Sequence, residues 1–217
     1  MNPQQARFNM VEQQIRPWDV LDKTVLHILS ELPREIFVPQ AFQALAYTDT
    51  TIPLGHGQEM VEPRIDARLM HDLQLLGHEQ VLEIGTGSGY LTALLAKRAQ
   101  HVLSLEINPE LAQTASHNLQ RAGITNAQVR VANGSNGAVV DGPFDAIVLG
   151  GSVAEVPPSL LQQLKIGGRL IAIVGEEPIM SATLFTRTAD ANLRSQALWD
   201  TSAPRLQGFT EPTRFQF

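Results

Sequence analysis

The sequence predicts an α/β protein built on a doubly wound, mostly parallel sheet, with an antiparallel hairpin at the C-terminal end and a helical cap at the N-terminal end. From residue 80 onward, short apolar runs alternate with amphipathic runs, a pattern typical of parallel strands linked by helices. The first apolar run leads directly into closely spaced glycines. The first 76 residues lack this alternation and contain mainly helical spacing, which indicates a separate cap.

The N-terminal part is expected to be helical, with one interruption. Its predicted elements are helices over 4–16, 19–32 and 64–76 and a short helical turn within 33–47. Asp22 is the expected N-cap of the second helix. The stretch 48–63 is rich in proline and glycine and has no helical period. We expect a long loop there, and long loops inside compact domains are often functional.

The C-terminal part shows the alternation of strands and helices. The predicted strands are 80–84, 101–107, 127–132, 144–150 and 167–175, and the predicted helices are 89–98, 109–123 and 157–165. Residues 181–201 favour two further strands around a turn near Ala189 to Asn192. The expected division is a cap with a substrate loop over 1–76 and an α/β core over 77–217, packed as one compact unit.

Composition limits the classes of function. The chain of 217 residues has a net charge of −6 and no dense basic run, which argues against a nucleic-acid surface. It contains no cysteine, which excludes disulfides and thiolate sites, and its histidines share no metal-ligand spacing. The sequence shows no signal-peptide pattern and no apolar run near the length of a membrane span. We expect a soluble cytoplasmic protein without a metal, with its oligomeric state open.

The glycine turn indicates a nucleotide site. Gly85, Gly87 and Gly89 alternate with other residues between an apolar run and an amphipathic run. Glycines permit positive φ and close approach of a ligand, and the helix that follows directs free N–H groups at it. In the dinucleotide fingerprint the third glycine falls where Tyr90 stands here. An NAD-dependent oxidoreductase is therefore disfavoured against a smaller nucleoside ligand, although a simple tight turn is the structural alternative.

Two further strand ends are expected to meet this turn. Glu106 ends the second strand about twenty residues after Gly85, where an acid accepts hydrogen bonds from ribose hydroxyls. Asn133 follows the third strand and could meet the amino group of an adenine. Carboxyl ends of parallel strands share one edge of a sheet, so the three positions would converge on one nucleoside.

Several stretches together resemble a known family. They are MVEQQIRPWDVLD, LPREIFVP, AYTDTTIPLGHGQ, VLEIGTGSGY, PFDAIVL and QLKIGGRLIAIVG. The glycine motif and the following acid resemble class I S-adenosylmethionine (SAM) methyltransferases, and the first three stretches resemble the protein-L-isoaspartate O-methyltransferase family. The resemblance covers residues 6–175. It implies a Rossmann-like fold, SAM as cofactor with S-adenosyl-L-homocysteine as product, and carboxyl methylation of L-isoaspartyl residues in damaged proteins, a protein-repair reaction.

The resemblance also implies site residues. The implied cofactor-binding residues are Glu83, Ile84, Gly85, Thr86, Gly87, Ser88, Gly89, Glu106, Ile107, Asn133 and Gly134. The family usually has aspartate where this chain has Asn133, but the amide keeps an acceptor oxygen. On the acceptor side, the part of the site that would hold the methyl acceptor, the candidate catalytic residues are Asp49, Gln58 and Val61. Asp49 could contact the substrate or stabilise a turn, and Gln58 could hydrogen-bond the acceptor or the SAM carboxylate or act within the loop. By the resemblance, Val61 stands at the position of the family's substrate-contacting serine.

The acceptor side departs from the family pattern. The family's Thr–Ile–Ser after the conserved glutamine is Glu59, Met60 and Val61 here. Val61 cannot form a side-chain hydrogen bond, and Glu59 adds a negative charge where a carboxylate substrate should lie. The alternatives are therefore a SAM-dependent methyltransferase with a different acceptor, or a SAM-binding protein without isoaspartyl activity.

The chemistry needs few catalytic groups if the acceptor is a carboxylate. A carboxylate is already ionised, so proximity and alignment supply most of the effect. A hydroxyl or amine acceptor would need a base, and His56 is the histidine best placed by sequence, although an exposed loop position explains it more simply.

Overall fold

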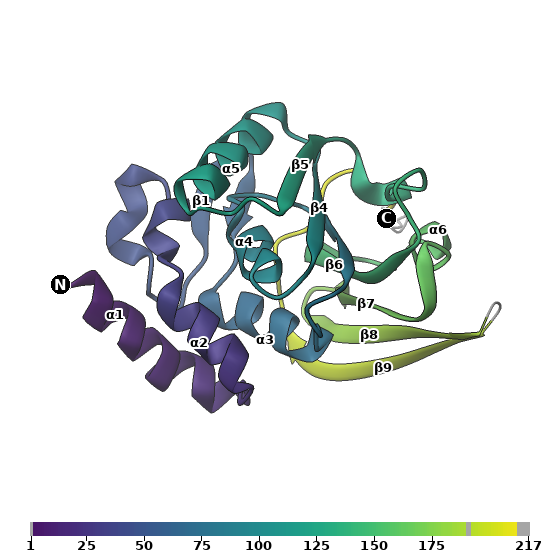
Figure 1. The fold of residues 1–217 in the computed structure, drawn as a ribbon, viewed down its shortest axis with the longest axis horizontal. Coiled ribbons are helices and arrows are strands. Elements are labelled where there is room, and N and C mark those ends of the chain that lie inside the picture. The colour runs from purple at the N-terminus through teal and green to yellow at the C-terminus, as the bar shows by residue number, and fades with distance from the viewer. Residues whose placement is uncertain (1, 190–191, 212–217) are drawn as a thin grey trace, which may run out of the picture.

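The computed structural model describes residues 2–189 and 192–211 and contains a seven-stranded sheet in the order β5-β4-β3-β6-β7-β8-β9 (Figure 1). The strands are β3 (Gln80–Ile84), β4 (His101–Glu106), β5 (Ala127–Val131), β6 (Phe144–Val153), β7 (Leu164–Glu176), β8 (Ile179–Ala189) and β9 (Asn192–Thr201). Strands β3 to β7 pair in parallel, and β8 and β9 continue the sheet in antiparallel pairing. The predicted fold class is confirmed.

The strand order places the glycine turn at the point where the sheet reverses direction. β3 pairs with β4 on one side and with β6 on the other, so the connections after β3 run first one way and then the other. Ligands of such sheets bind outside the carboxyl ends of the strands at this point. The turn after β3 therefore lies where a nucleoside would be expected.

Helices cover the sheet and build the cap. They are α1 (Pro3–Met10), η1 (Val11–Ile15, a π-helix), the 3₁₀-helix η2 (Arg16–Trp18), α2 (Lys23–Glu31), the 3₁₀-helices η3 (Arg34–Phe37) and η4 (Gln40–Leu45), α3 (Pro63–Leu73), α4 (Tyr90–Ala96), α5 (Pro109–Arg121), the 3₁₀-helix η5 (Gly134–Asn136) and α6 (Pro158–Leu161). Asp22 caps α2 by accepting from the backbone N–H groups of Thr24 and Val25, as predicted.

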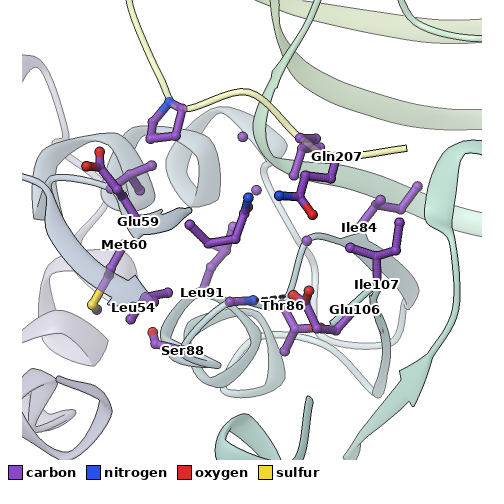
Figure 2. A pocket seen from close by; sticks show the side chains of 18 of the residues that line it. Leu54, Glu59, Met60, Ile84, Thr86, Ser88, Leu91, Glu106, Ile107 and Gln207 are labelled. Carbon is purple, nitrogen blue, oxygen red and sulfur yellow. Dashed lines mark hydrogen bonds between the residues drawn. The ribbon is translucent and has the colours of Figure 1, made fainter. Parts of the chain in front are cut away.

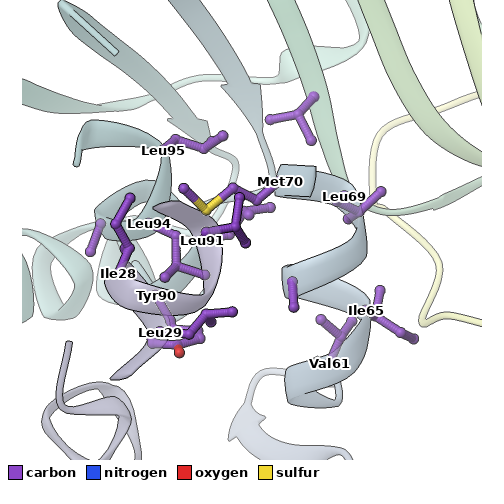
Figure 3. Close-up of a cluster of buried hydrophobic side chains, with 14 of the residues drawn as sticks. Ile28, Leu29, Val61, Ile65, Leu69, Met70, Tyr90, Leu91, Leu94 and Leu95 are labelled. Atoms are coloured by element: carbon purple, nitrogen blue, oxygen red, sulfur yellow. The ribbon is translucent and has the colours of Figure 1, made fainter. Parts of the chain in front are cut away.

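One hydrophobic cluster joins the cap to the sheet. Leu29 of α2 and Leu69 of α3 are fully buried together with Leu94 of α4 (Figure 3). Each fully buried leucine contributes about 1.5–3 kcal/mol relative to exposure. The cap therefore shares its core with α4, the helix that follows the glycine turn.

Three predicted elements differ from the structure. The expected helix over 157–165 ends after one turn, because Leu164 already pairs with Phe144 and begins β7. The expected loop over 48–63 contains a small hairpin of β1 (Ile52–Gly55) and β2 (Gln58–Met60).

The first helix is the third difference. The expected helix over 4–16 changes to a π-helix after Met10 and to a 3₁₀-helix before Pro17. The centre of the predicted turn near Ala189 to Asn192 lies outside the described residues. Within the described ranges, no helix is long and apolar enough to cross a bilayer.

Candidate active site

A cleft opens at the carboxyl ends of β3, β4 and β6 (Figure 2). It encloses about 730 Å³ between the protein atoms, part of it open to solvent. The lining residues are Leu54, Gln58, Glu59, Met60, Val61, Asp66, Ile84, Gly85, Thr86, Gly87, Ser88, Tyr90, Leu91, Leu105, Glu106, Ile107, Gly134, Gly150, Gly151, Pro204, Arg205, Leu206 and Gln207. The cleft therefore combines the glycine turn, the hairpin β1–β2 and a C-terminal segment.

The glycine turn has the backbone that its sequence predicts. Gly85, Gly87 and Gly89 have φ values of 91°, 53° and 86°, a region that other residues rarely adopt. A Cβ added to Gly150 at the end of β6 would lie 2.6 Å from the carbonyl oxygen of Gly85. The turn is thus packed directly against the neighbouring strand, and its shape depends on a glycine that lies far away in sequence.

Glu106 is held in a fixed orientation at the cleft. Its Oε2 accepts from the N–H of Gly87 at 2.8 Å, and its Oε1 accepts from the N–H of Asn108 at 3.0 Å. Each carboxylate oxygen can accept more than one hydrogen bond. Both oxygens therefore keep capacity for hydroxyl donors of a ligand, and the side chain needs no reordering to use it.

Glu83 serves the core rather than the cleft. Its side chain is fully buried and accepts from the Thr92 hydroxyl of α4. Burial raises the pKa of this carboxyl to about 8. The preference for a neutral form follows from the cost of placing a charge in a low-dielectric interior.

The structure brings most of the predicted residues together. Those that line the cleft are Gln58, Val61, Ile84, Gly85, Thr86, Gly87, Ser88, Glu106, Ile107 and Gly134. Those that do not line it are Asp49, Glu83, Gly89 and Asn133. Gly89 faces the opposite side, where an added Cβ would meet Ala115 of α5 at 3.3 Å.

Asn133 and Asp49 are occupied elsewhere. The Oδ1 atom of Asn133, the acceptor that was expected to meet an adenine, instead caps η5 by accepting from the N–H of Ser135 at 3.0 Å. Asp49 pairs with Arg64 outside the cleft. Asn133 satisfies its acceptor within its own turn, whereas Asp49 pairs with an arginine side chain of α3.

The acceptor side is formed by the end of the hairpin. Val61 is 6% exposed, and its carbonyl accepts from Nη2 of the buried Arg34 at 2.6 Å. Glu59 is exposed and lines the cleft, and its side chain has no hydrogen bond or ion pair to any described residue. The side that faces an acceptor thus presents an apolar side chain and an unpaired carboxylate.

Asp66 of α3 also borders this side. It is buried within 3.9 Å of Arg34, and burial raises its pKa to about 7 despite that cation. Sequence inspection did not single out Asp66, because an acid on an amphipathic helix is usually solvated.

The C-terminal strap, residues 202–208, was missed by sequence analysis. It is held on β6 by Ser152, whose N–H donates to the carbonyl of Pro204 at 2.8 Å and whose carbonyl accepts from the N–H of Leu206 at 2.9 Å. Leu206 lies over the glycine turn, 2.5 Å from the position of an added Cβ on Gly85. The signal for this segment in the sequence is the apolar pair Pro204 and Leu206, which follows the last predicted strand.

Comparison with known proteins agrees with this geometry. A sequence model described as protein-L-isoaspartate(D-aspartate) O-methyltransferase matches residues 5–202. The protein-L-isoaspartate O-methyltransferase 1 of Syntrophobacter fumaroxidans is 43% identical over 176 residues, which cover 81% of this chain and 82% of the relative. That of Methanoculleus marisnigri is 44% identical over 169 residues, 78% and 77% of the two chains.

Solved structures show the same fold. A protein-L-isoaspartate O-methyltransferase structure, 26% identical, superposes with a TM-score of 0.81 over 93% of this chain and 66% of that one. A Plasmodium falciparum structure, described as a protein-L-isoaspartate O-methyltransferase in complex with S-adenosyl-L-homocysteine, is 23% identical with a TM-score of 0.77 over 95% and 99% of the chains. By its sequence match across residues 5–202 and its shared fold, this chain belongs to the protein-L-isoaspartate O-methyltransferase family.

Proposed function

We propose that this protein is a SAM-dependent methyltransferase that methylates the free carboxylate of L-isoaspartyl residues in damaged proteins and peptides. The observation that carries the proposal is the Glu106 carboxylate, fixed by the N–H of Gly87 at the sheet's reversal point. Membership of the protein-L-isoaspartate O-methyltransferase family supports the reaction.

The cleft fits SAM by the chemistry of its lining. Glu106 offers two oriented acceptors for the ribose hydroxyls. Ile107, an exposed apolar side chain beside it, would cover an adenine face. Gly134 lines the cleft and packs against Ile84, where an added Cβ would collide at 2.2 Å. Gly85 to Ser88 would hold the amino-acid part of the cofactor.

The protein contributes to catalysis by holding the cofactor and the acceptor in position. SAM supplies an electrophilic methyl group, which an acceptor oxygen takes in an in-line displacement. A carboxylate acceptor is ionised at neutral pH, so the protein needs no general base. Holding both reactants in line contributes about 7–11 kcal/mol of barrier reduction, and the apolar side chains of Met60, Val61 and Leu91 exclude water from the reacting atoms.

The hairpin supplies the acceptor side. Gln58 lines the cleft, and its amide would donate to the acceptor or to the cofactor carboxylate. His56 lies at the hairpin turn with φ of 55° and its Nε2 is 3.2 Å from Glu110 of α5. It does not line the cleft, so a base role for His56 is not part of this proposal.

A second candidate function keeps SAM and changes the acceptor. The unpaired Glu59 carboxylate and the apolar Val61 favour it, because a negative group near the acceptor disfavours a second carboxylate. An acceptor with a neutral or cationic group would suffer no such repulsion.

Transfer of a radiolabelled methyl group tests the proposal. An isoaspartyl peptide is compared with its aspartyl twin and with the same peptide in D-aspartyl form, at enzyme concentrations high enough for single turnover. We expect label in the isoaspartyl peptide and none in its aspartyl twin, released by mild base as a carboxyl ester; the D-aspartyl form, which the matching family description also names, measures how broad the choice of acceptor is. Tight SAM binding without transfer to this peptide would favour the second candidate.

The proposal extends to location and partners. A cytoplasmic enzyme acting on proteins or peptides, without a nucleic-acid partner, agrees with the net charge of −6.

A further inference from the structure

The C-terminal strap brings a cation to the acceptor side of the cleft. Next to the cleft lies an outer cavity between the hairpin, the end of β7 and the strap, lined in part by Glu59, Glu62, Glu177 and Arg205. Glu59, Pro204 and Arg205 line both spaces. A substrate segment that approaches from the outer cavity would therefore pass Arg205 before its carboxylate reaches the transferred methyl group.

The charge of Arg205 is opposite to that of the acidic side chains around it. Among the described residues that line the two cavities, it is the one cationic side chain. The acidic side chains around it are Glu59, Glu62, Asp66, Glu106, Glu177 and Glu211. A carboxylate entering this surrounding is repelled by the exposed acids Glu59 and Glu177, because like charges at close range disfavour each other. An anionic acceptor needs a cation, and the described lining offers Arg205.

The guanidinium is held in place yet retains free donors. Its Nη1 donates to the carbonyl of Gly175 at 2.9 Å, and its Nε lies 3.1 Å from Oε1 of Glu211. Its Nη2 has no partner among the described residues, so two of the five N–H donors of an arginine remain available. The side chain is 26% exposed, which leaves it accessible from the outer cavity while its base is fixed.

Hydrogen bonds to Ser152 fix the strap on both sides of Arg205. The backbone of Ser152 pairs with Pro204 and Leu206 on either side of Arg205, and the Ser152 hydroxyl donates to the carbonyl of Ala203 at 2.8 Å. Arg205 also lies beyond residues 5–202, the part of the chain that matches the family.

We propose that Arg205 binds the carboxylate of the methyl acceptor through Nη2 and sets the preference of the enzyme for a free carboxylate over its amide. This inference rests on the proposed isoaspartyl activity, which places a carboxylate in the cleft. It also explains how an acidic surrounding accepts an anionic substrate, since Val61 offers no side-chain donor and Glu59 repels.

Binding of two matched peptides tests the inference without relying on catalysis. One peptide carries an isoaspartyl residue with its free α-carboxylate, and the other carries the α-carboxamide at the same position. Calorimetry with the S-adenosyl-L-homocysteine-loaded full chain is expected to show that Arg205→Gln weakens the acid peptide about 10- to 100-fold, the loss of a charged hydrogen bond. The amide peptide should change by less than about twofold.

Two further variants guard against an effect of misfolding. Arg194→Gln removes an exposed arginine of β9 and should leave both peptides unchanged. Glu211→Gln removes the acid beside Arg205 and should strengthen binding of the acid peptide, a gain that damage to the fold cannot produce. Unchanged affinity of Arg205→Gln for S-adenosyl-L-homocysteine would show that the cofactor side is intact.

The outcomes separate this inference from the proposed function. Equal losses for both peptides, no loss, or no binding of the acid peptide to the wild-type protein would overturn the role of Arg205. Methyl transfer to the isoaspartyl peptide that does not depend on Arg205 would leave the proposed function standing alone. Charge-dependent binding through Arg205 without transfer would support the carboxylate site and contradict isoaspartyl methylation.

Discussion

Arg34 donates a hydrogen bond from Nη2 to the backbone carbonyl of Val61 at 2.6 Å, and this contact joins the helical cap to the acceptor side of the cleft. The guanidinium is fully buried, donates from Nε to the carbonyl of Ala46 at 3.1 Å and lies 4.9 Å from the ring centre of Tyr90. Desolvation lowers the pKa of Arg34, and the charge of Asp66 opposes this shift. Arg34 thus braces the cleft, in the sense that its buried hydrogen bonds hold the backbone of Val61 in position.

Replacing Arg34 with methionine should therefore destabilise the fold. Removing the cation leaves two carbonyls without their donor and Asp66 without its nearest positive charge, and breaking a buried pair typically costs about 3–5 kcal/mol. Urea unfolding followed by circular dichroism measures the change. Arg130→Met, which breaks the exposed pair with Asp141, should cost about 1 kcal/mol or less; comparable losses for the two variants would contradict the bracing role.

Glu106 is expected to dominate cofactor affinity among the side chains of the cleft. Glu106→Ala removes both acceptors for the ribose and releases the N–H of Gly87, and hydrogen bonds to a charged group predict a loss of about 10- to 100-fold in SAM affinity. Calorimetry with SAM gives the value. Glu110→Ala removes an exposed acid at the start of α5 and should leave SAM affinity unchanged.

The backbone geometry of the glycine turn and its place at the strand ends could be predicted from the sequence because the signals are local. A strand, three alternating glycines and an acid at the next strand end lie within about twenty residues, and backbone geometry follows directly from glycine at positive φ. β3 coincides with its predicted range, 80–84. The helix expected over 157–165 failed because a long-range strand pairing at Leu164 overrides local propensity.

The residues on the acceptor side of the cleft are brought together by contacts between segments that lie far apart in the sequence. Arg205 reaches the cleft because the backbone around it pairs with Ser152, some fifty residues earlier. No local sequence pattern predicts that pairing. At Asn133 the structure adds a hydrogen bond that spacing did not predict, since a strand-end amide close to its own helix turn caps that turn. Spacing in the sequence therefore predicts which residues lie at one edge of the sheet, but not which hydrogen bonds their side chains form there.

Gly150→Ala should impair SAM binding without a contact to the cofactor through its side chain. The added Cβ would lie 2.6 Å from the carbonyl oxygen of Gly85, and because this neighbour is backbone the glycine turn must shift. We expect weaker SAM affinity by about tenfold, given the sensitivity of binding sites to small displacements. Gly167→Ala strains a backbone with φ of 82° but places its Cβ in open space, so it should lower stability and alter the SAM affinity of the folded protein little; equal SAM affinities for the two variants would indicate that the turn tolerates displacement.

Stability should fall as pH rises from about 5 to 8, in part because of Glu83. Burial raises its pKa to about 8 in the folded state, whereas the unfolded chain ionises near 4.5. Between these values the folded protein holds a proton that the unfolded chain releases, so the free energy of unfolding decreases with pH by up to about 1.4 kcal/mol per pH unit. This contribution is complete below pH 4.5 and lost above 8.

Denaturant unfolding at pH 6 and pH 8.5 measures this dependence. Glu83→Gln keeps the shape of the protonated acid and should flatten the fall in stability across this range. Glu110→Gln changes an exposed acid of the same type and should leave the slope as in the wild-type protein. A slope that persists in Glu83→Gln would assign the proton to another group, with Asp66 the next to test.

The double variant Glu59→Thr with Val61→Ser tests what the hairpin selects. Threonine removes the unpaired negative charge at the junction of cleft and outer cavity, and serine adds a hydroxyl where Val61 lines the cleft. One new hydrogen bond and the loss of a repulsion predict a rise of up to about tenfold in kcat/KM for an isoaspartyl peptide. The single variants apportion the effect, and the charge term alone should weaken as salt increases. If the pair leaves kcat/KM unchanged while SAM affinity is intact, the side chains of Glu59 and Val61 do not limit acceptor binding.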